Sequence, residues 1–272
     1  ITPTLDLERS LAAQGYDLIT GFDEVGRGAL AGPVMVGCAA IWACDLAPLD
    51  GDDSAELSGR TYLATDGVAD SKMLTEHRRE AIFDELRDWC AAYAVGQASN
   101  TEIDEWGITY ALGVAALRAL SQVERELGYD LEGDWTAKRH AGEIVEGRPG
   151  DSVGESIGNC GESVRALPKV AGILDGPSDY ITKRQHVRRA GRADSTDITT
   201  KVKGDQHCAT VATAAVIAKV TRDRLMVDLA QSNPRYAAYE WAHNKGYGSA
   251  AHRAAIAEHG PTPLHRVSWH LT

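Results

Sequence analysis

The sequence predicts a layered domain of the α/β or α+β class. Short apolar runs rich in β-forming residues alternate with longer stretches in which apolar residues recur at helical spacing. Such a mixture of strands and helices is typical of a sheet covered by helices around one core. With 272 residues and 43% hydrophobic content, the chain is long enough to bury that core, so we expect one domain over residues 1–272.

Strand and helix signals follow one another through the first half of the chain. Residues 16–22 and 33–42 are apolar, and the glycine-rich segment between them predicts a hairpin whose first strand leads into Asp23. The elements expected next are a helix at 76–89 capped by Thr75, a strand at 91–98, and helices at 103–127 capped by Asn100 or Thr101.

Regular structure in the second half begins with a short apolar run at 169–174. This run predicts a strand that ends at the turn Asp175-Gly176-Pro177. Another strand is expected at 198–202. Apolar residues at 208–229 have helical spacing, and the helix should end before Asn233-Pro234 because the residue before a proline disfavours helical geometry.

Two segments without periodicity interrupt this pattern. Residues 45–69 are acidic, and residues 129–165 are rich in Gly, Glu and Ser, so we expect both to be surface insertions. The formal net charge of −11 is unusual for a protein that binds phosphates, yet residues 161–272 carry 16 Lys and Arg against 10 Asp and Glu. A local basic surface therefore stays open as an interpretation, although composition alone does not predict a nucleic-acid partner.

The sequence favours a cytoplasmic protein. It has no apolar run of about 18 residues, the length that a membrane helix requires, and its first ten residues are charged where an export signal would be apolar. The five cysteines are scattered and include no C-x-x-C pair, so they indicate neither a disulfide framework nor a zinc site.

Acidic residues stand at the ends of three expected strands. Asp23 and Glu24 follow the first strand, Asp175 follows the fourth, and Asp205 comes shortly after the fifth. Ligand clefts form at strand ends in open α/β sheets, so these carboxylates are candidates to converge. Clustered carboxylates repel one another unless cations lie between them, and Mg²⁺ or Mn²⁺ suit oxygen ligands. An isolated Asp at a strand end can equally cap a turn.

Motifs around these carboxylates resemble those of the ribonuclease HII family, the bacterial type 2 ribonucleases H. The longest is GFDEVGRGALAGPV at Gly21–Val34. The others follow in family order along nearly the whole chain: Asp70–Leu74, Glu102–Glu105, Leu174–Gly176, Lys203–Asp205, Ala218–Asp223, Lys245–Tyr247 and His265-Arg266. One such motif is weak, but so many in order identify the chain as a member of that family.

The resemblance implies a ribonuclease H-like fold of the α/β class, with a central mixed β-sheet flanked by helices. It implies that Asp23, Glu24, Asp175 and Asp205 are catalytic and hold two Mg²⁺ or Mn²⁺ ions. The implied enzyme hydrolyses the RNA strand of RNA–DNA hybrids and incises 5′ of ribonucleotides embedded in duplex DNA. Its products carry 3′-hydroxyl and 5′-phosphate ends, as suits ribonucleotide excision repair and DNA replication.

The resemblance also implies substrate contacts. The backbone of Gly26-Arg27-Gly28 would approach the ribose 2′-hydroxyl, the group that separates RNA from DNA, and Tyr247 would pack on the adjoining deoxyribose. Ser71 and Lys72 would contact phosphate, and Lys203 would either contact phosphate or neutralise the acidic quartet. No membrane and no obligate protein partner are expected, and the chain is expected to act as a monomer.

Three further polar residues receive structural interpretations. Arg222 and Asp223 are expected to form an ion pair on the long helix, with Asp223 as the reserve candidate for the acidic cluster. His207 lies two residues after Asp205. A histidine near the start of a helix is more often solvated or capping than a ligand, so we do not assign it to the metal site.

Other classes of function explain the motifs less well. A dinucleotide-binding enzyme would need G-x-G-x-x-G at the start of a helix, but the third glycine, Gly32, is one position late and Pro33 begins a strand-like run. A noncatalytic nucleic-acid binder gains nothing from four carboxylates facing phosphate. A ribonuclease HIII-like nuclease is the closest alternative, and it would differ in its preference for single embedded ribonucleotides.

Overall fold

The computed structural model describes residues 2–46, 74–128, 168–184 and 196–272. Apart from residues 45 and 46, the two expected insertions lie outside these ranges. Ser71 and Lys72 also lie outside them, so their expected phosphate contacts stay predictions.

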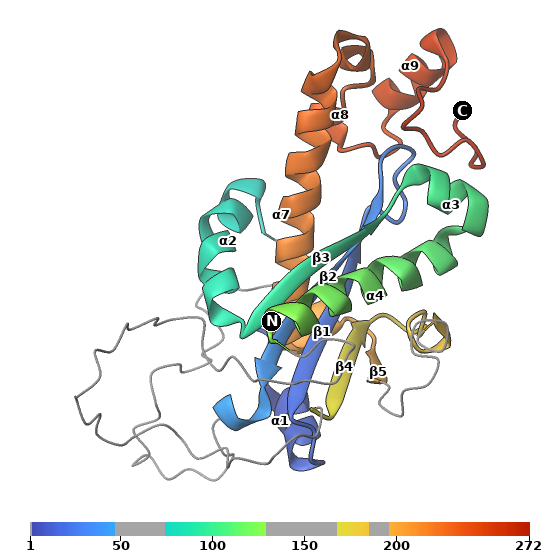
Figure 1. The fold of residues 1–272 in the computed structure, drawn as a ribbon. Helices are drawn as coiled ribbons and strands as arrows, with labels where there is room; N and C mark the ends of the chain where they lie inside the picture. The colour runs from blue at the N-terminus through green and yellow to red at the C-terminus, as the bar shows by residue number, and fades with distance from the viewer. Residues whose placement is uncertain (1, 47–73, 129–167, 185–195) are drawn as a thin grey trace, which may run out of the picture.

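The described strands form one mixed sheet (Figure 1). Its strand order is β3-β2-β1-β4-β5, with β1 antiparallel to β2 and parallel to β4. The strand bounds are β1 (Leu18–Val25), β2 (Val34–Trp42), β3 (Ala92–Ala98), β4 (Val170–Asp175) and β5 (Asp197–Lys201). The predicted α/β class and the hairpin of the first two strands are confirmed.

Helices cover both faces of this sheet (Figure 1). The helix α7 (Ala209–Ser232) packs on one face together with α2 (Glu76–Trp89), whereas α4 (Ile108–Glu126) packs on the other. Successive strand residues point to opposite faces. Accordingly, Ala39 contributes to the core beneath α2 and α7, and Cys38 contributes to the core beneath α4.

Shorter elements complete the described chain. They are α1 (Asp6–Ala13), η1 (Ala43–Asp45), α3 (Asn100–Trp106), α6 (Gly204–His207), η2 (Pro234–Tyr239), α8 (Trp241–Asn244) and α9 (Ala250–His259). Periodicity did not predict α1 or the helices after α7. In Figure 1, α8 and α9 lie together at one end of the molecule, beyond the loop between β1 and β2.

Helix caps test the predicted boundaries. Thr75 caps α2 as predicted, because its side chain accepts a hydrogen bond from the Arg78 N–H at 3.2 Å. The prediction that Asn100 or Thr101 caps the next helix is wrong. Ser99 is the cap, and Glu102 returns a hydrogen bond to the Ser99 N–H, which completes a capping box.

The start of α7 approaches the sheet at backbone contact. A Cβ on Gly21 of β1 would lie 2.3 Å from the carbonyl carbon of Thr210, so only glycine allows α7 this close. The N-terminal segment binds the junction of α6 and α7. Thr4 N donates to His207 O at 3.0 Å, and Ala209 N donates to Thr4 O at 2.9 Å. These contacts hold α6, which carries Asp205, beside the end of β4.

Across the described ranges, no helix combines the length and apolarity needed to cross a membrane.

Candidate active site

Asp23 and Asp175 lie side by side on neighbouring parallel strands. Each comes one residue after the paired residues Phe22 and Leu174 of β1 and β4, and parallel neighbours are separated by about 4.8 Å. Both carboxylates point to the face where Ile173 packs against α7, because strand side chains alternate. Asp23 is buried and Asp175 is half-buried. The convergence of these two positions was predicted from their strand ends.

Asp205 reaches the same place from α6 and not from a strand end. The expected strand stops at Lys201, and Asp205 stands in the first turn of the short helix that follows. The Gly204 N–H donates to Asp175 Oδ1 at 2.7 Å, which ties this helix to β4 directly. Lys203 precedes the turn in a left-handed conformation at φ 57° and is exposed beside the acidic residues.

Glu24 points away from the other three carboxylates. As the residue after Asp23 in β1, it faces the α4 side of the sheet. There its Oε1 accepts from Arg27 at 3.3 Å and its Oε2 accepts from the Tyr180 hydroxyl at 3.4 Å. Burial, and then the negative charges of Glu24 and Asp23, raise the pKa of Tyr180 well above its usual value. Tyr180 therefore lies within the electrostatic field of both acids.

The carboxylates of the quartet do not converge on a single point. Within the described residues, no three Asp, Glu, His or Cys side chains surround a common point as metal ligands would. The donors themselves are hard carboxylate oxygens, of which those of Asp23 and Asp175 come from one face of the sheet and that of Asp205 from α6, and this chemistry fits Mg²⁺ or Mn²⁺. Glu24 would join them only by leaving Arg27 and Tyr180.

Two buried arginines hold the loop between β1 and β2. Arg266 donates to the carbonyl oxygens of Gly26 at 2.7 Å, Arg27 at 2.9 Å and Gly32 at 3.1 Å. Burial, and then the nearby charge of Arg222, lower the pKa of Arg266 to about 9. Arg266 thus fixes the orientation of these three carbonyl groups. The exposed residues Arg27 and Gly28 are thereby held in place at the surface.

Arg222 holds the same loop from α7. It donates to the carbonyl oxygens of Pro33 at 3.0 Å, Ala31 at 3.2 Å and Lys245 at 2.9 Å. A Cβ on Gly26 would lie 2.1 Å from Arg222 Nε, and Gly26 also has a positive φ of 80°, so glycine is required there twice over. The predicted ion pair between Arg222 and Asp223 is wrong, because the guanidinium binds carbonyl groups.

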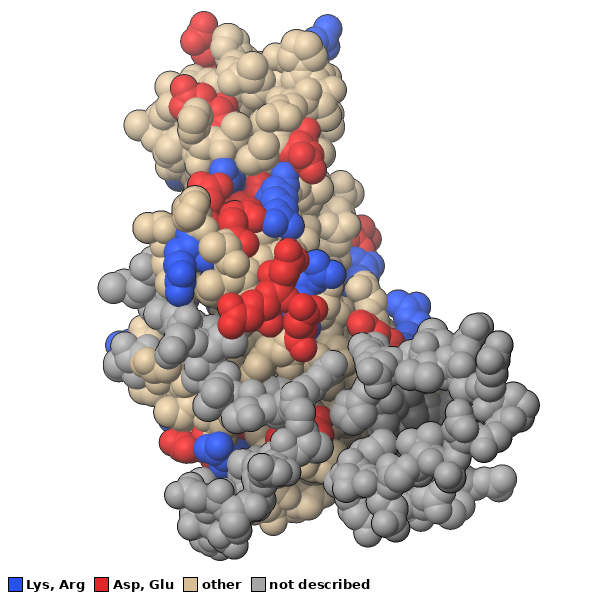
Figure 2. Space-filling view, turned by 90° about the vertical axis from the view of Figure 1, so that its left-hand side faces the viewer, with Lys and Arg blue, Asp and Glu red and all other residues tan. Residues whose placement is uncertain are grey.

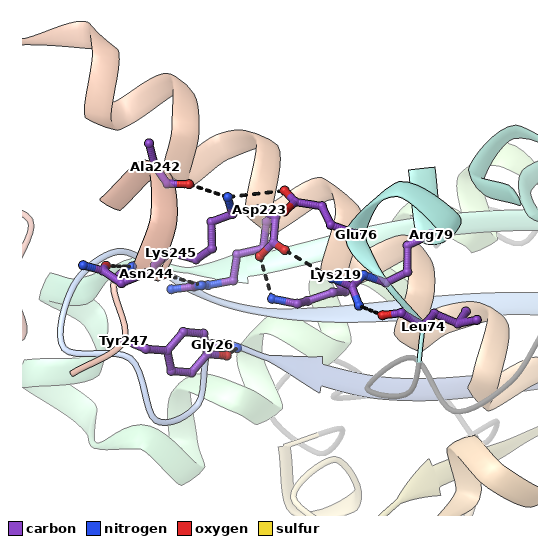
Figure 3. Close-up of polar contacts among 12 residues, drawn as sticks. Gly26, Leu74, Glu76, Arg79, Lys219, Asp223, Ala242, Asn244, Lys245 and Tyr247 are labelled. Atoms are coloured by element: carbon purple, nitrogen blue, oxygen red, sulfur yellow. Dashed lines mark hydrogen bonds and ion pairs between the residues drawn. The ribbon is translucent and has the colours of Figure 1, made fainter. Parts of the chain in front are cut away.

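Asp223 belongs to a separate network between α7 and α2 (Figure 3). It accepts from Lys219 Nζ at 2.7 Å and lies 4.0 Å from Arg79 Nη2. Close by, Lys245 lies 3.4 Å from Glu76 and donates to the carbonyl of Ala242. These contacts join the start of α2 to the segment that carries Tyr247, and they do not place Asp223 in the acidic cluster.

Tyr247 lies against the Gly26 end of the loop (Figure 3). Its hydroxyl accepts a hydrogen bond from the Gly26 N–H at 3.1 Å, and its backbone forms an antiparallel bridge with Ala29. The Arg222 guanidinium lies 5.4 Å from the ring centre and Lys219 Nζ lies 5.9 Å from it. The structure therefore brings the two predicted sugar-contacting elements, the glycine loop and Tyr247, into direct contact.

Two groups at this site were not identified from the sequence. The motif His265-Arg266 has no role assigned from the sequence. No local pattern near it indicates that Arg266 binds a loop more than 230 residues earlier. Tyr180 follows a turn and carried no signal. His207 is exposed, as expected for a histidine that is not a ligand.

Charged side chains of both signs share the surface shown in Figure 2. Acidic and basic groups are interspersed on this face, and its described part shows no continuous basic field. The mixture agrees with the net charge of −11. Phosphate binding on this face would therefore depend on individual cations.

Comparisons with known proteins agree with this architecture. The family model described as Ribonuclease HII matches residues 20–127 and 175–272. The Ribonuclease HII of Streptomyces avermitilis is 40% identical over 268 residues, covering 98% of this chain and 83% of the relative.

Two of the similar solved structures share the fold. A Bst-RNase HIII in complex with Mn²⁺ is 17% identical, with a TM-score of 0.57 over 97% of this chain and 71% of that chain. The RNase HII in a PCNA complex from Archaeoglobus fulgidus is 21% identical, with a TM-score of 0.54 over 92% of this chain and 93% of that chain.

Proposed function

Because this chain belongs to the ribonuclease HII family, a family of hydrolases, we propose that it hydrolyses the RNA strand of RNA–DNA hybrids and incises 5′ of ribonucleotides embedded in duplex DNA. The products would carry 3′-hydroxyl and 5′-phosphate ends. The observation that supports this proposal best is the adjacency of Asp23 and Asp175 at the ends of β1 and β4, with Asp205 tied to them through the Gly204–Asp175 hydrogen bond.

The acidic quartet would hold two Mg²⁺ or Mn²⁺ ions. Carboxylate oxygens are the ligands that both ions prefer, and a Bst-RNase HIII of the same fold was solved with Mn²⁺. When bound, a pair of such ions supplies an activated water and neutralises the leaving oxygen. In the proposed site, the Gly204 N–H would orient Asp175, and Glu24 would have to leave Arg27 and Tyr180 to become a metal ligand.

Recognition of the substrate would fall to the loop and to Tyr247. The exposed backbone at Arg27 and Gly28 would approach the ribose 2′-hydroxyl, with Gly26 fixing the start of the turn. The ring of Tyr247 would pack on the deoxyribose that follows. Lys203 is exposed next to the acidic residues, a position that suits a phosphate contact, and we keep Ser71 and Lys72 as proposed phosphate contacts.

The proposal assigns this activity to the chain alone, acting as a monomer in the cytoplasm. The Archaeoglobus fulgidus relative was solved with PCNA. The proposed chemistry involves residues of this chain only, so the purified chain should cleave without any protein added.

The test is a cleavage assay with three matched duplexes. One carries a single ribonucleotide, one carries an uninterrupted RNA strand, and one is entirely DNA. With Mg²⁺ or Mn²⁺ we expect cleavage of the first two, and a cut on the 5′ side of the single ribonucleotide. Cleavage of the uninterrupted RNA strand alone would favour the ribonuclease HIII-like alternative. Cleavage of neither would refute the nuclease proposal.

A further inference from the structure

Two buried histidines lie directly behind Tyr247. His252 on α9 is 0% exposed, and His265 in the C-terminal segment is 1% exposed. Their Nε2 atoms are 3.0 Å apart, and His252 Nδ1 lies 2.9 Å from the carbonyl oxygen of Tyr247. Neither residue contacts the acidic cluster in any described interaction, so the proposed catalytic chemistry leaves this pair without a role.

The hydrogen-bond donors around the pair fix where its protons lie. The Thr262 N–H donates to His265 Nδ1 at 2.8 Å, so a neutral His265 carries its proton on Nε2 and donates to His252. His252 Nε2 also accepts from Trp241 Nε1 at 3.0 Å. The proton of His252 is therefore on Nδ1, where it is donated to the Tyr247 carbonyl.

The surroundings keep both rings neutral. Burial lowers the pKa of His252 against the opposing effect of its hydrogen bond to Tyr247, with the charge of Arg253 adding to the lowering. Burial, followed by the proximity of His252, lowers the pKa of His265 to about 4. Tyr239 of η2 packs its ring edge-on, 5.0 Å from His265 and 6.1 Å from His252. No described carboxylate contacts the pair, and the adjacent Arg266 directs its guanidinium to the glycine loop.

The pair can act on Tyr247 because that residue is held at both ends. Its carbonyl accepts from His252 and from the Ser249 N–H at 2.8 Å, and its hydroxyl accepts from the Gly26 N–H at 3.1 Å. With main chain and hydroxyl both held, the long axis of the ring between them is held too. A loss of the His252 contact would remove one of the two donors to the Tyr247 carbonyl and loosen the contact with Gly26.

We propose that His252 and His265 are positioning residues that set the placement of Tyr247 through one directed chain of hydrogen bonds, and thereby set selectivity for an RNA–DNA junction. The statement about selectivity rests on the proposed function of Tyr247. The statement about placement does not, because it concerns the protein without substrate.

Two substitutions at one position separate the two bonds that His252 makes. His252→Asn puts an amide N–H close to the place of Nδ1, so it keeps the donor to Tyr247 and loses the acceptor for Trp241. His252→Gln reaches the place of Nε2, so it keeps that acceptor and loses the donor. Both remove the same buried ring, and thermal unfolding of each variant checks that their stabilities match.

The first readout is the ratio of kcat/KM on the single-ribonucleotide duplex to that on the uninterrupted RNA strand. We expect His252→Gln to lower this ratio by about fivefold to tenfold, the effect of one lost hydrogen bond, while His252→Asn stays within about twofold of the wild type. Equal ratios in both variants would overturn the proposal, because a role in packing alone affects both alike.

The second readout is the hydrogen exchange rate of the Gly26 amide, measured by NMR without substrate. We expect faster exchange in His252→Gln and a rate close to the wild type in His252→Asn, with Tyr247→Phe as the control that removes the accepting oxygen. Unchanged exchange in His252→Gln would overturn the positioning role. If the wild type shows no junction preference while exchange behaves as expected, the proposed function of Tyr247 fails and the positioning role stands.

Discussion

The Gly26 N–H donates to the Tyr247 hydroxyl at 3.1 Å across 221 residues of sequence. This bond joins the two elements to which we assign sugar recognition, and it places them on one surface before any substrate binds. A duplex would bind to a surface on which Tyr247 and the loop at Gly26 are already in place. The entropy cost of ordering these two elements is therefore met when the chain folds and not when the substrate binds.

Asp175→Asn should abolish turnover and leave the fold intact. The asparagine keeps an oxygen that can accept the Gly204 N–H, but it lacks the charge that a divalent ion requires. We expect the rate on either substrate to fall by at least about a thousandfold. Circular dichroism and thermal unfolding would check the fold, and Asp228→Asn on the exposed side of α7 is the matched control. A rate near that of the wild type would remove Asp175 from the quartet.

Tyr247→Ala should reduce discrimination more than it reduces cleavage of a continuous RNA strand. The proposed role of the ring is to pack on a sugar that lacks a 2′-hydroxyl, so its removal should lower the junction preference by about tenfold. Tyr247→Phe keeps the ring and loses only the Gly26 contact, and it should lose less. Steady-state kinetics on the two substrates measure the ratio. Identical ratios in all three proteins would contradict the assignment.

Arg266→Lys should destabilise the protein despite conserving the charge. A single ammonium cannot reach the carbonyl groups of Gly26, Arg27 and Gly32 together, so buried acceptors would be left unpaired at a cost of about 3 kcal/mol. Denaturant unfolding measures the change, and Arg235→Lys at an exposed position is the control. Equal stability of the two variants would show that these bonds contribute little.

Mild acid should lower the free energy of unfolding through the histidine pair. The pKa of His265 is lowered to about 4 in the folded chain, whereas an unfolded histidine titrates near about 6.5. Its contribution is complete above the unfolded value and is lost as the pH falls toward the folded one. Between about pH 7.5 and about pH 5 the expected loss is about 2 kcal/mol.

The control for this pH dependence is His265→Asn, which does not titrate there and keeps an acceptor for the Thr262 N–H. It should lose correspondingly less stability over the same interval. Parallel pH curves for the two proteins would argue that the pair contributes nothing.

Local patterns in the sequence predicted the parts of the fold that depend on local chemistry. Apolar runs rich in β-forming residues predicted β1 and β2, and Thr75 was predicted as a cap because a hydroxyl before a helix accepts its free N–H groups. Ser99 was missed because Ser99, Asn100 and Thr101 are all good caps, and only the return bond from Glu102 distinguishes them. Alternation in β1 would also have shown that Asp23 and Glu24 face opposite sides.

The remaining features depend on contacts that no local pattern encodes. Apart from Lys245, the carbonyl partners of Arg222 and Arg266 come from a loop about 190 to 240 residues away. The protons on His252 and His265 follow from Thr262, Trp241 and Tyr247, which surround the pair only in the folded chain. The adjacency of Asp23 and Asp175 requires a parallel pairing whose existence, but not whose register, could be argued from the strand ends.

That parallel pairing carries a consequence for synthesis on the ribosome. Thr20 of β1 bonds to Ala171 of β4 across 151 residues, and the Asp205 helix follows later still. Closing so long a loop is a slow step in folding. During translation, β1 and β2 are therefore synthesised well before β4 and α6, and the acidic site can be completed only after Asp205 has been added.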